Sequence, residues 1–138
     1  MSGWLLDTHV WLWYAEGMTD QLKPTAIKKL DSARRAEGLW ISAISVWEIG
    51  MQVARGRVQL SVPLNNWVER ALSGPGIYFA PLNAVAAAES TLLPGALHGD
   101  PADRFLIATA RTQDMTLATR DRNIVKYSKL GFVRVMKV

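Results

Sequence analysis

Short apolar runs alternate along the chain with longer stretches of helical period. The runs of strand length are "WLLD" (4–7), "LWIS" (39–42), "IYFAPL" (77–82), "MTLATRD" (115–121) and "GFVRVMKV" (131–138). Helices are predicted between them, over 8–17, 23–38, 43–56, 62–74, 83–95 and 101–113. Strands that alternate with helices predict a parallel sheet covered by helices on both faces. We therefore expect an α/β fold with about five strands.

Residues typical of helix ends support these boundaries. Pro24 lies in the first turn of the second predicted helix and Gly38 follows its end, which is the usual asymmetry of helix termini. Ser42 and Asn83 each precede a predicted helix and can cap it through a side-chain oxygen. A chain of 138 residues suffices for one hydrophobic core and is too short for two, so residues 1–138 are expected to form a single domain.

Acidic residues recur where predicted strands end or the next helices begin. They are Asp7 after the first strand, Glu48 in the helix after the second, Asp103 in the first turn of the last predicted helix, and Asp121 at the end of the fourth strand. Each also has an ordinary structural interpretation, as a helix cap, a residue that stabilises a helix dipole, or a solvent-facing side chain. Ligands in open α/β sheets bind beyond the carboxyl ends of the strands, and this fold would bring all four acids to that edge.

The stretch "HGDPADRFLIA" (98–108) contains two aspartates where one would suffice to begin a helix. Asp100 is suited to cap the helix, or to contact the ligands of a bound ion, whereas Asp103 can face the other acids. Arg104 is a candidate for pairing with a carboxylate or a phosphate, or a solvated residue. His98 is expected to be an ordinary loop residue rather than a catalyst.

Two hydroxyl groups lie close in sequence to these acids. Thr8 directly follows Asp7, and Ser45 lies three residues before Glu48, on the same face of the predicted helix. Both are candidates for contacting the carboxylates or a substrate.

Several carboxylates gathered at one place repel one another, and each raises the pKa of the others unless a cation lies among them. Ligands that are all oxygen atoms favour a hard divalent ion such as Mg²⁺ or Mn²⁺. Such ions bind phosphates and activate water for an in-line phosphoryl displacement. The pattern therefore predicts a metal-dependent nuclease, which needs no Ser, Cys or His nucleophile.

The distribution of charge is consistent with an anionic partner. The net charge is +4, but residues 1–100 carry a net −1 and residues 101–138 a net +5. This asymmetry suggests nucleic acid, although a solvated basic face explains it equally well. The chain has no cysteine, which fits the reducing cytoplasm. Without a long apolar run or a basic N-terminal segment, we expect neither a membrane span nor a signal peptide.

Other classes of protein lack their motifs. Neither G-x-G-x-x-G nor G-x-x-x-x-G-K-[ST] occurs, so dinucleotide-binding and P-loop functions have no phosphate-binding loop. A haloacid-dehalogenase-type phosphatase would end its first strand in D-x-D, where this chain has "DTH". A receiver domain would need paired acids there. His9 and His98 have no cysteine with which to complete a zinc site.

Four segments together resemble the PIN-domain ribonucleases, in particular the VapC toxins of bacterial toxin–antitoxin pairs. They are "LLDTHVWLW", "SAISVWEIGMQVARGRVQL", "DPADRFLIATA" and "LATRDRNIVKY", in this order over nearly the whole chain. The resemblance implies a three-layer α/β/α domain with a central parallel sheet of about five strands. It also implies Mg²⁺- or Mn²⁺-dependent cleavage of RNA and neutralisation by a small cognate antitoxin. The family's acidic positions fall on Asp7, Glu48, Asp103 and Asp121, of which the last varies within the family.

The family often dimerises, so a homodimer is expected. Trp11, Trp13 and Trp47 are candidates for a dimer or antitoxin surface, or for packing in the core. Two other functions stay open: a PIN-type nuclease that processes RNA or DNA outside a toxin pair, and a catalytically idle module that binds nucleic acid.

Overall fold

The structure is a computed structural model that describes residues 3–97 and 99–138, so the expectation for His98 lies outside the described residues. Within these ranges five strands form one parallel sheet in the order β3-β2-β1-β4-β5. The strands are β1 (Trp4–Leu6), β2 (Leu39–Ser42), β3 (Ile77–Ala80), β4 (Thr116–Thr119) and β5 (Arg134–Lys137). The helices are α1 (Thr8–Glu16), α2 (Pro24–Ala36), α3 (Ala43–Ala54), α4 (Leu64–Leu72), α5 (Ala84–Thr91), α6 (Pro101–Thr112) and α7 (Arg122–Ser128). The predicted α/β fold is confirmed.

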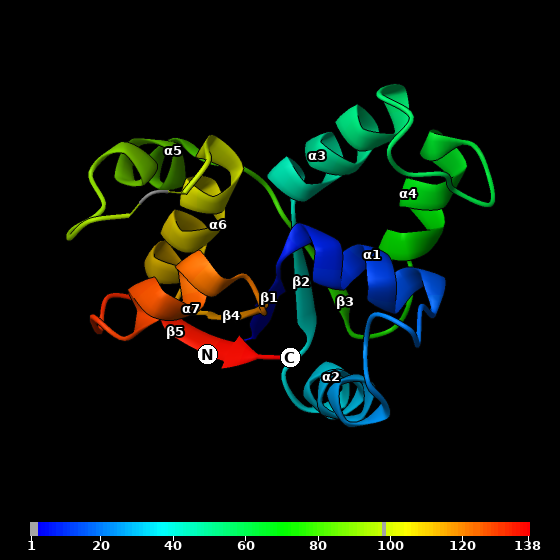
Figure 1. Cartoon of the computed structure of the whole chain (residues 1–138), viewed down its shortest axis with the longest axis horizontal. Coiled ribbons are helices and arrows are strands. Elements are labelled where there is room, and N and C mark those ends of the chain that lie inside the picture. The colour runs from blue at the N-terminus through cyan, green and yellow to red at the C-terminus, as the bar shows by residue number, and fades with distance from the viewer. Residues whose placement is uncertain (1–2, 98) are drawn as a thin grey trace.

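The sheet separates two sets of helices, which gives the three layers expected from the sequence (Figure 1). On one face, Leu6 and Ile41 of the sheet pack with α1 to α4 in a core that includes Trp11 and Trp67. On the other face, Leu5 belongs to the same core as the apolar residues of α6 and α7. Because neighbouring residues of a strand point to opposite faces, a sheet covered on both sides consists of continuous apolar runs.

Side-chain caps fix the helix starts that the sequence predicts. The Ser42 side chain accepts a hydrogen bond from the backbone N–H of Ile44, and the Asn83 side chain accepts one from Ala86. Pro24 occupies the first turn of α2, and Gly17 ends α1 in a left-handed conformation (φ 64°) that favours glycine.

The sequence analysis missed α7, which follows β4 directly. Asp121 was expected at the end of a strand, but β4 ends at Thr119 and Asp121 caps α7 instead. Ile124 and Tyr127, three residues apart, are both buried on one side of this short helix. That spacing was the signal for a helix.

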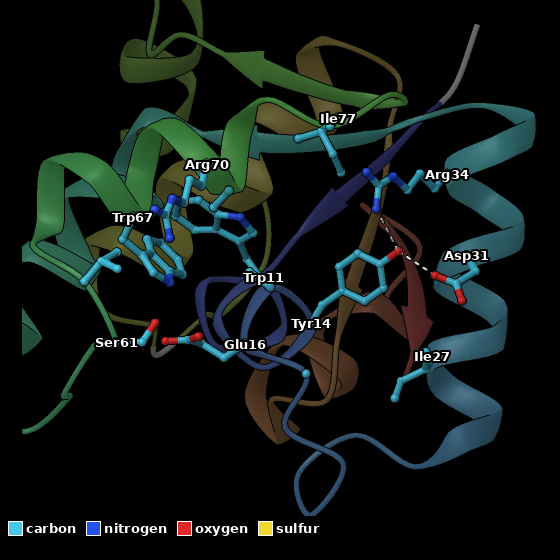
Figure 2. Close-up of a pocket in the computed structure, with 15 residues that line it drawn as sticks. Trp11, Tyr14, Glu16, Ile27, Asp31, Arg34, Ser61, Trp67, Arg70 and Ile77 are labelled. Carbon is cyan, nitrogen blue, oxygen red and sulfur yellow. Dashed lines mark hydrogen bonds between the residues drawn. The ribbon is translucent and has the colours of Figure 1, made fainter.

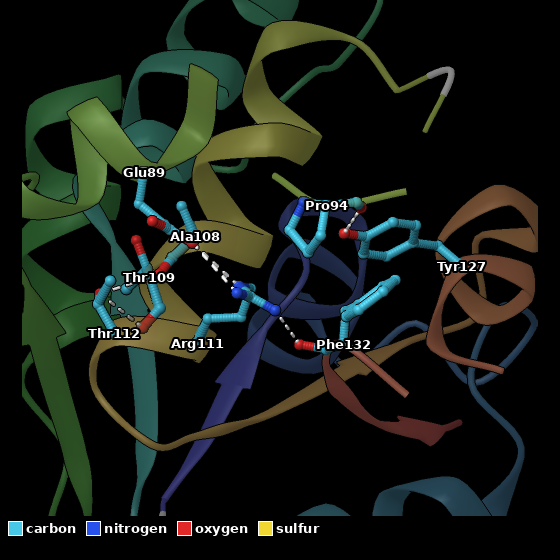
Figure 3. Close-up of polar contacts among 8 residues, drawn as sticks. All are labelled: Glu89, Pro94, Ala108, Thr109, Arg111, Thr112, Tyr127 and Phe132. Atoms are coloured by element: carbon cyan, nitrogen blue, oxygen red, sulfur yellow. Dashed lines mark hydrogen bonds and ion pairs between the residues drawn. The ribbon is translucent and has the colours of Figure 1, made fainter. Parts of the chain in front are cut away.

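The C-terminal half of α6 is joined to its neighbours by paired charges (Figure 3). The Arg111 guanidinium lies 3.2 Å from the Glu89 carboxylate of α5 and donates a hydrogen bond of 2.6 Å to the carbonyl of Phe132. Tyr127 of α7 donates to the carbonyl of Pro94 at 2.6 Å. These contacts fasten α5, α6, α7 and the segment before β5 to one another.

In the described part of the chain, no helix has both the length and the apolar character needed to cross a membrane.

Candidate active site

Asp7 lies directly beyond β1, where the sheet register fixes its surroundings. Leu6 pairs with Ala118 of β4, so Asp7 lies beside Thr119. The Thr119 hydroxyl donates a hydrogen bond of 2.6 Å to Oδ2 of Asp7, and the backbone N–H of Thr8 donates one of 2.7 Å to Oδ1. Asp7 is thus both the cap of α1 and a buried carboxylate. Burial raises its pKa, and the charge of Asp121 acts in the same direction.

Thr119 is a residue that the sequence analysis did not select. Its hydroxyl is buried, donates to Asp7 and accepts a hydrogen bond of 3.0 Å from the backbone N–H of Asp121. It therefore connects two of the predicted acids. A hydroxyl residue at the end of β4 was visible in "TLATRD", but its partner became evident only from the pairing of β1 with β4.

Glu48 is connected to Asp7 through Thr8, which contacts both acids. The Thr8 hydroxyl donates to Oε1 of Glu48 and lies 2.8 Å from the hydroxyl of Ser45, which is also on α3. Thr8 therefore contacts a carboxylate directly, whereas Ser45 contacts the Thr8 hydroxyl. Glu48 is half-buried, and its burial raises its pKa, with Asp100 and Asp7 adding to the effect.

Asp103 is the most strongly perturbed carboxyl group described. Burial and then the charges of four neighbouring acids, Asp100, Asp7, Asp121 and Glu48, raise its pKa to about 7. Like charges disfavour the ionised form of a carboxyl group, so each of these four acids adds to the effect of burial. The structure thus brings the four predicted acids and Asp100 to one edge of the sheet. This group of five residues is called the acidic edge below.

Asp100 has the capping role that the sequence left open. Its Oδ1 accepts a hydrogen bond of 2.9 Å from the backbone N–H of Asp103, at the start of α6. Of the two aspartates in the "DPAD" segment, one therefore begins the helix and the other faces its acidic neighbours.

Among the described residues, Arg104 forms its hydrogen bonds with backbone carbonyls. Its Nε donates to the carbonyl of Ser90 at 2.9 Å, and one terminal nitrogen lies 3.4 Å from the carbonyl of Leu97. The arginine thus contacts the end of α5 and the segment after it. These contacts give Arg104 a structural role, and a phosphate partner for it stays a prediction.

The acidic edge fits a divalent cation in the kind of its donors, which are all carboxylate oxygens, and in the mutual repulsion that a cation would relieve. As the side chains stand, however, no three His, Cys, Asp or Glu residues within 3–97 and 99–138 are grouped closely enough to hold an ion. Hydrogen bonds already engage both carboxylate oxygens of Asp7 and the Oδ1 of Asp121. A metal at Asp7, Glu48, Asp103 and Asp121 therefore stays a prediction.

A cavity of about 560 Å³ lies at the other end of α1, among α1, α2 and α4 (Figure 2). Trp11 lines it and packs against Trp67, with ring centroids 4.9 Å apart. Trp11 is only 1% exposed, so it belongs to the core and the suggestion that it lies on a partner surface is wrong. In the same wall the Tyr14 hydroxyl donates to Asp31 at 2.6 Å.

The other two tryptophans remain accessible. Trp47 is 58% exposed on α3, and Trp13 is partly exposed on α1. Both stay candidates for contact with another molecule.

The fold and the acidic edge define a class of protein: a three-layer α/β/α domain with carboxylates gathered at the carboxyl edge of a parallel sheet. The profile of the PIN domain family matches residues 4–130. The chain therefore belongs to the PIN-domain family.

Similar proteins agree with this assignment. Over 124 residues the chain is 30% identical to Ribonuclease VapC22 of Mycobacterium tuberculosis, covering 90% of this chain and 91% of that protein. It resembles a chain of the crystal structure of VapBC2 from Rickettsia felis bound to a promoter DNA fragment, with a TM-score of 0.70, 15% identity and 97% of both chains covered. A chain of FitAcB from Neisseria gonorrhoeae matches with a TM-score of 0.60, 25% identity and 96% of both chains covered.

Proposed function

We propose that the chain is a metal-dependent endoribonuclease and the toxin of a toxin–antitoxin pair, that it acts in the cytoplasm, and that residues 1–138 work as one PIN domain. Its membership of the PIN family and its likeness to a protein named a ribonuclease support RNA as the substrate. PIN-domain ribonucleases generally depend on a divalent metal. The observation that carries the proposal is the placement of acidic residues beyond the carboxyl ends of β1 and β4 and at the start of α6, in a chain that matches the PIN family.

The acidic side chains would hold Mg²⁺ or Mn²⁺ through Asp7, Glu48 and Asp103, with Asp121 beside them. A divalent ion bound there supplies activation of water and neutralisation of charge on the phosphate. Hydrogen bonds within the chain hold two of these carboxylates. Thr119 donates to Asp7, and Thr8 donates to Glu48, so a hydroxyl group holds each of two carboxylates from different elements.

Repulsion among the acids argues for a function beyond helix capping. Asp7, Asp100 and Asp121 each cap a helix, a role that an asparagine fills about as well without the charge. Asp103 and Glu48 cap nothing, and both have raised pKa values. Charges kept where they weaken the fold are expected at functional sites.

We further propose two protein partners: a small cognate antitoxin and a second copy of the chain. The likeness to toxin chains from VapBC complexes supports the antitoxin. The largely exposed Trp47 is the residue we expect at a protein contact, since large exposed aromatic side chains are enriched there.

The central test measures cleavage of a labelled single-stranded RNA with Mn²⁺ or Mg²⁺, together with ion binding by calorimetry. Asp7→Asn should lower the cleavage rate by about a thousandfold, the equivalent of about 4 kcal/mol of transition-state stabilisation. Asp20→Asn is the matched control, because Asp20 is an exposed aspartate between α1 and α2. Cleavage that persists in a chelator, or in Asp7→Asn, would contradict the proposal.

The same assays separate the alternatives. An idle binding module would hold RNA but bind no Mn²⁺ and cleave nothing. A toxin should arrest growth when expressed in bacteria, and a small protein encoded beside its gene should relieve the arrest. Cleavage without growth arrest would favour an RNA-processing or DNA-processing nuclease.

A further inference from the structure

One side of α1 presents a stripe of side chains that begins next to the acidic edge. His9, Trp13 and Glu16 are spaced four and three residues apart, so they share one face of the helix. His9 is exposed, whereas Trp13 and Glu16 are partly exposed. This face is not the one that places Trp11 in the core.

The stripe forms one wall of a groove of about 530 Å³. The opposite wall comes from the end of α3 and the segment after it, with Gln52 and the exposed Arg57 among its residues. The groove therefore runs between α1 and α3, the two helices that also carry Thr8 and Glu48.

Trp13 packs against Arg120, the residue before Asp121 of the acidic edge. The Arg120 guanidinium lies over its ring, 4.1 Å from the centroid, and donates a hydrogen bond of 3.1 Å to the Gln21 side chain. The His9 ring is tilted by 39° against Trp13, with the centroids 5.7 Å apart. An aromatic surface fixed in this way loses little conformational entropy when a flat group packs on it.

The groove is continuous with the acidic edge. His9 lines the groove and directly follows Thr8, whose backbone N–H donates to Asp7 and whose hydroxyl donates to Glu48. Gln52, on the opposite wall, lies one helical turn after Glu48 on α3. Arg120 immediately precedes Asp121 in sequence. A chain of nucleotides whose phosphate reaches the acids would therefore extend naturally into this groove.

We infer that the groove between α1 and α3 binds a nucleotide of single-stranded RNA next to the cleaved bond, with its base packed on Trp13 and His9 and its phosphate held by Arg57. The inference rests on the proposed ribonuclease function. Bases that are not paired stack on aromatic side chains, and arginine holds the intervening phosphates. Glu16 repels phosphate, so the backbone lies on the Arg57 side of the groove and the base on the α1 side.

A peptide partner is the competing occupant, and the chemistry of the groove favours RNA over it. Its exposed members include an imidazole and a guanidinium, and a second guanidinium braces the aromatic surface. Cations and an aromatic ring together match the phosphates and flat faces of a nucleic acid strand.

Binding is measured without cleavage, by fluorescence anisotropy of a labelled single-stranded oligoribonucleotide with the full chain in a chelator. Trp13→Ala should weaken binding by about 5- to 150-fold, the loss of one base stack. Trp13→Phe keeps an aromatic ring and should stay within about threefold of the original chain. Thermal melts of both variants verify that α1 still folds.

A charge test uses two arginines of the same segment. Arg57→Ala should reduce the slope of log affinity against log salt by about 0.7, the value for one phosphate contact on a single strand. Arg55→Ala is the matched control, because Arg55 ends α3, is equally exposed and does not line the groove. Equal effects of the two substitutions would mean a diffuse electrostatic attraction and would overturn the inference.

The outcomes distinguish this inference from the function on which it rests. If the original chain cleaves RNA and both Trp13 variants bind it equally well, the groove assignment is wrong and the ribonuclease proposal stands. If Trp13→Ala loses the antitoxin but binds RNA normally, the groove belongs to the protein partner. If the original chain neither binds nor cleaves RNA, both proposals fail.

Discussion

Charged side chains are arranged differently at the two ends of α6. At its C-terminal end, Arg111 is paired with Glu89 at 3.2 Å and donates to the carbonyl of Phe132 at 2.6 Å (Figure 3). At its N-terminal end, burial and the charges of neighbouring acids raise the pKa of Asp103 to about 7. One end of the helix joins opposite charges and the other gathers like charges.

The difference shows which part of the helix serves the fold and which part serves function. Paired and hydrogen-bonded polar groups stabilise the packing of α5, α6 and α7. Like charges destabilise the folded state, so their presence needs another reason, such as a bound cation. Substitutions at the N-terminal end should therefore mainly change activity, and substitutions at the C-terminal end should mainly change stability.

The largest effect is expected from Asp103→Asn. RNA cleavage should fall by about a thousandfold, because a predicted metal ligand is lost. The free energy of unfolding of the metal-free protein at pH 8 should stay the same or rise, since one of the repelling charges is removed. Urea unfolding and a cleavage assay on the same sample measure both. A marked loss of stability with activity retained would show that Asp103 serves the fold.

The next largest effect is expected on the free energy of unfolding, which should depend on pH and on a bound ion. The pKa of Asp103 is about 7 in the folded chain against 3.8 for a free aspartate, so the folded state binds this proton more tightly. Its contribution to the free energy of unfolding is therefore present at low pH and is lost as the pH rises from about 4 to about 7. Saturating Mn²⁺ at pH 8, about a hundred times its Kd, should restore about 2.7 kcal/mol.

The comparison with Asp103→Asn isolates this group from all others that titrate. Relative to the original chain, the variant should gain stability between pH 4.5 and pH 8 and should respond less to Mn²⁺. Denaturant melts in a chelator at both pH values measure the difference. A difference that does not change with pH would contradict the assignment of the shift to Asp103.

Arg111→Met should have a smaller effect, and it should be on stability alone. The substitution keeps the apolar stem but leaves the partly buried Glu89 and the Phe132 carbonyl without their partner, at a cost of about 1–2 kcal/mol. RNA cleavage should stay within about twofold. The double variant with Glu89→Gln should lose less than the sum of the single losses, because the pair acts as one contact.

Local signals allowed most of the fold to be predicted from the sequence. Ser42, Asn83 and Pro24 act at the helix ends next to them, and each works as expected. The four acids could be assigned to one edge because parallel strands place their carboxyl ends together. The missed helix α7 had its own signal in the spacing of Ile124 and Tyr127.

Contacts between distant residues could not be predicted in this way. Thr119 holds Asp7 across 112 positions, and only the register of β1 with β4 makes them neighbours. Trp11 and Trp13 are two residues apart on α1, yet one packs on Trp67 and the other borders a groove. Arg104 donates to a backbone carbonyl of α5, a contact that depends on packing and that the spacing of residues in the sequence does not predict.

The smallest effect is expected at Asp100, which has both a structural role and a place among the acids. It belongs to the acidic edge, yet its Oδ1 caps α6 by accepting from the Asp103 N–H at 2.9 Å. Asparagine caps a helix about as well as aspartate, whereas alanine loses about 1 kcal/mol. Asp100→Asn should therefore keep stability and RNA cleavage nearly unchanged, and Asp100→Ala should lower only stability. If Asp100→Asn instead weakens Mn²⁺ binding by tenfold or more, then Asp100 supports the ion as well as the helix.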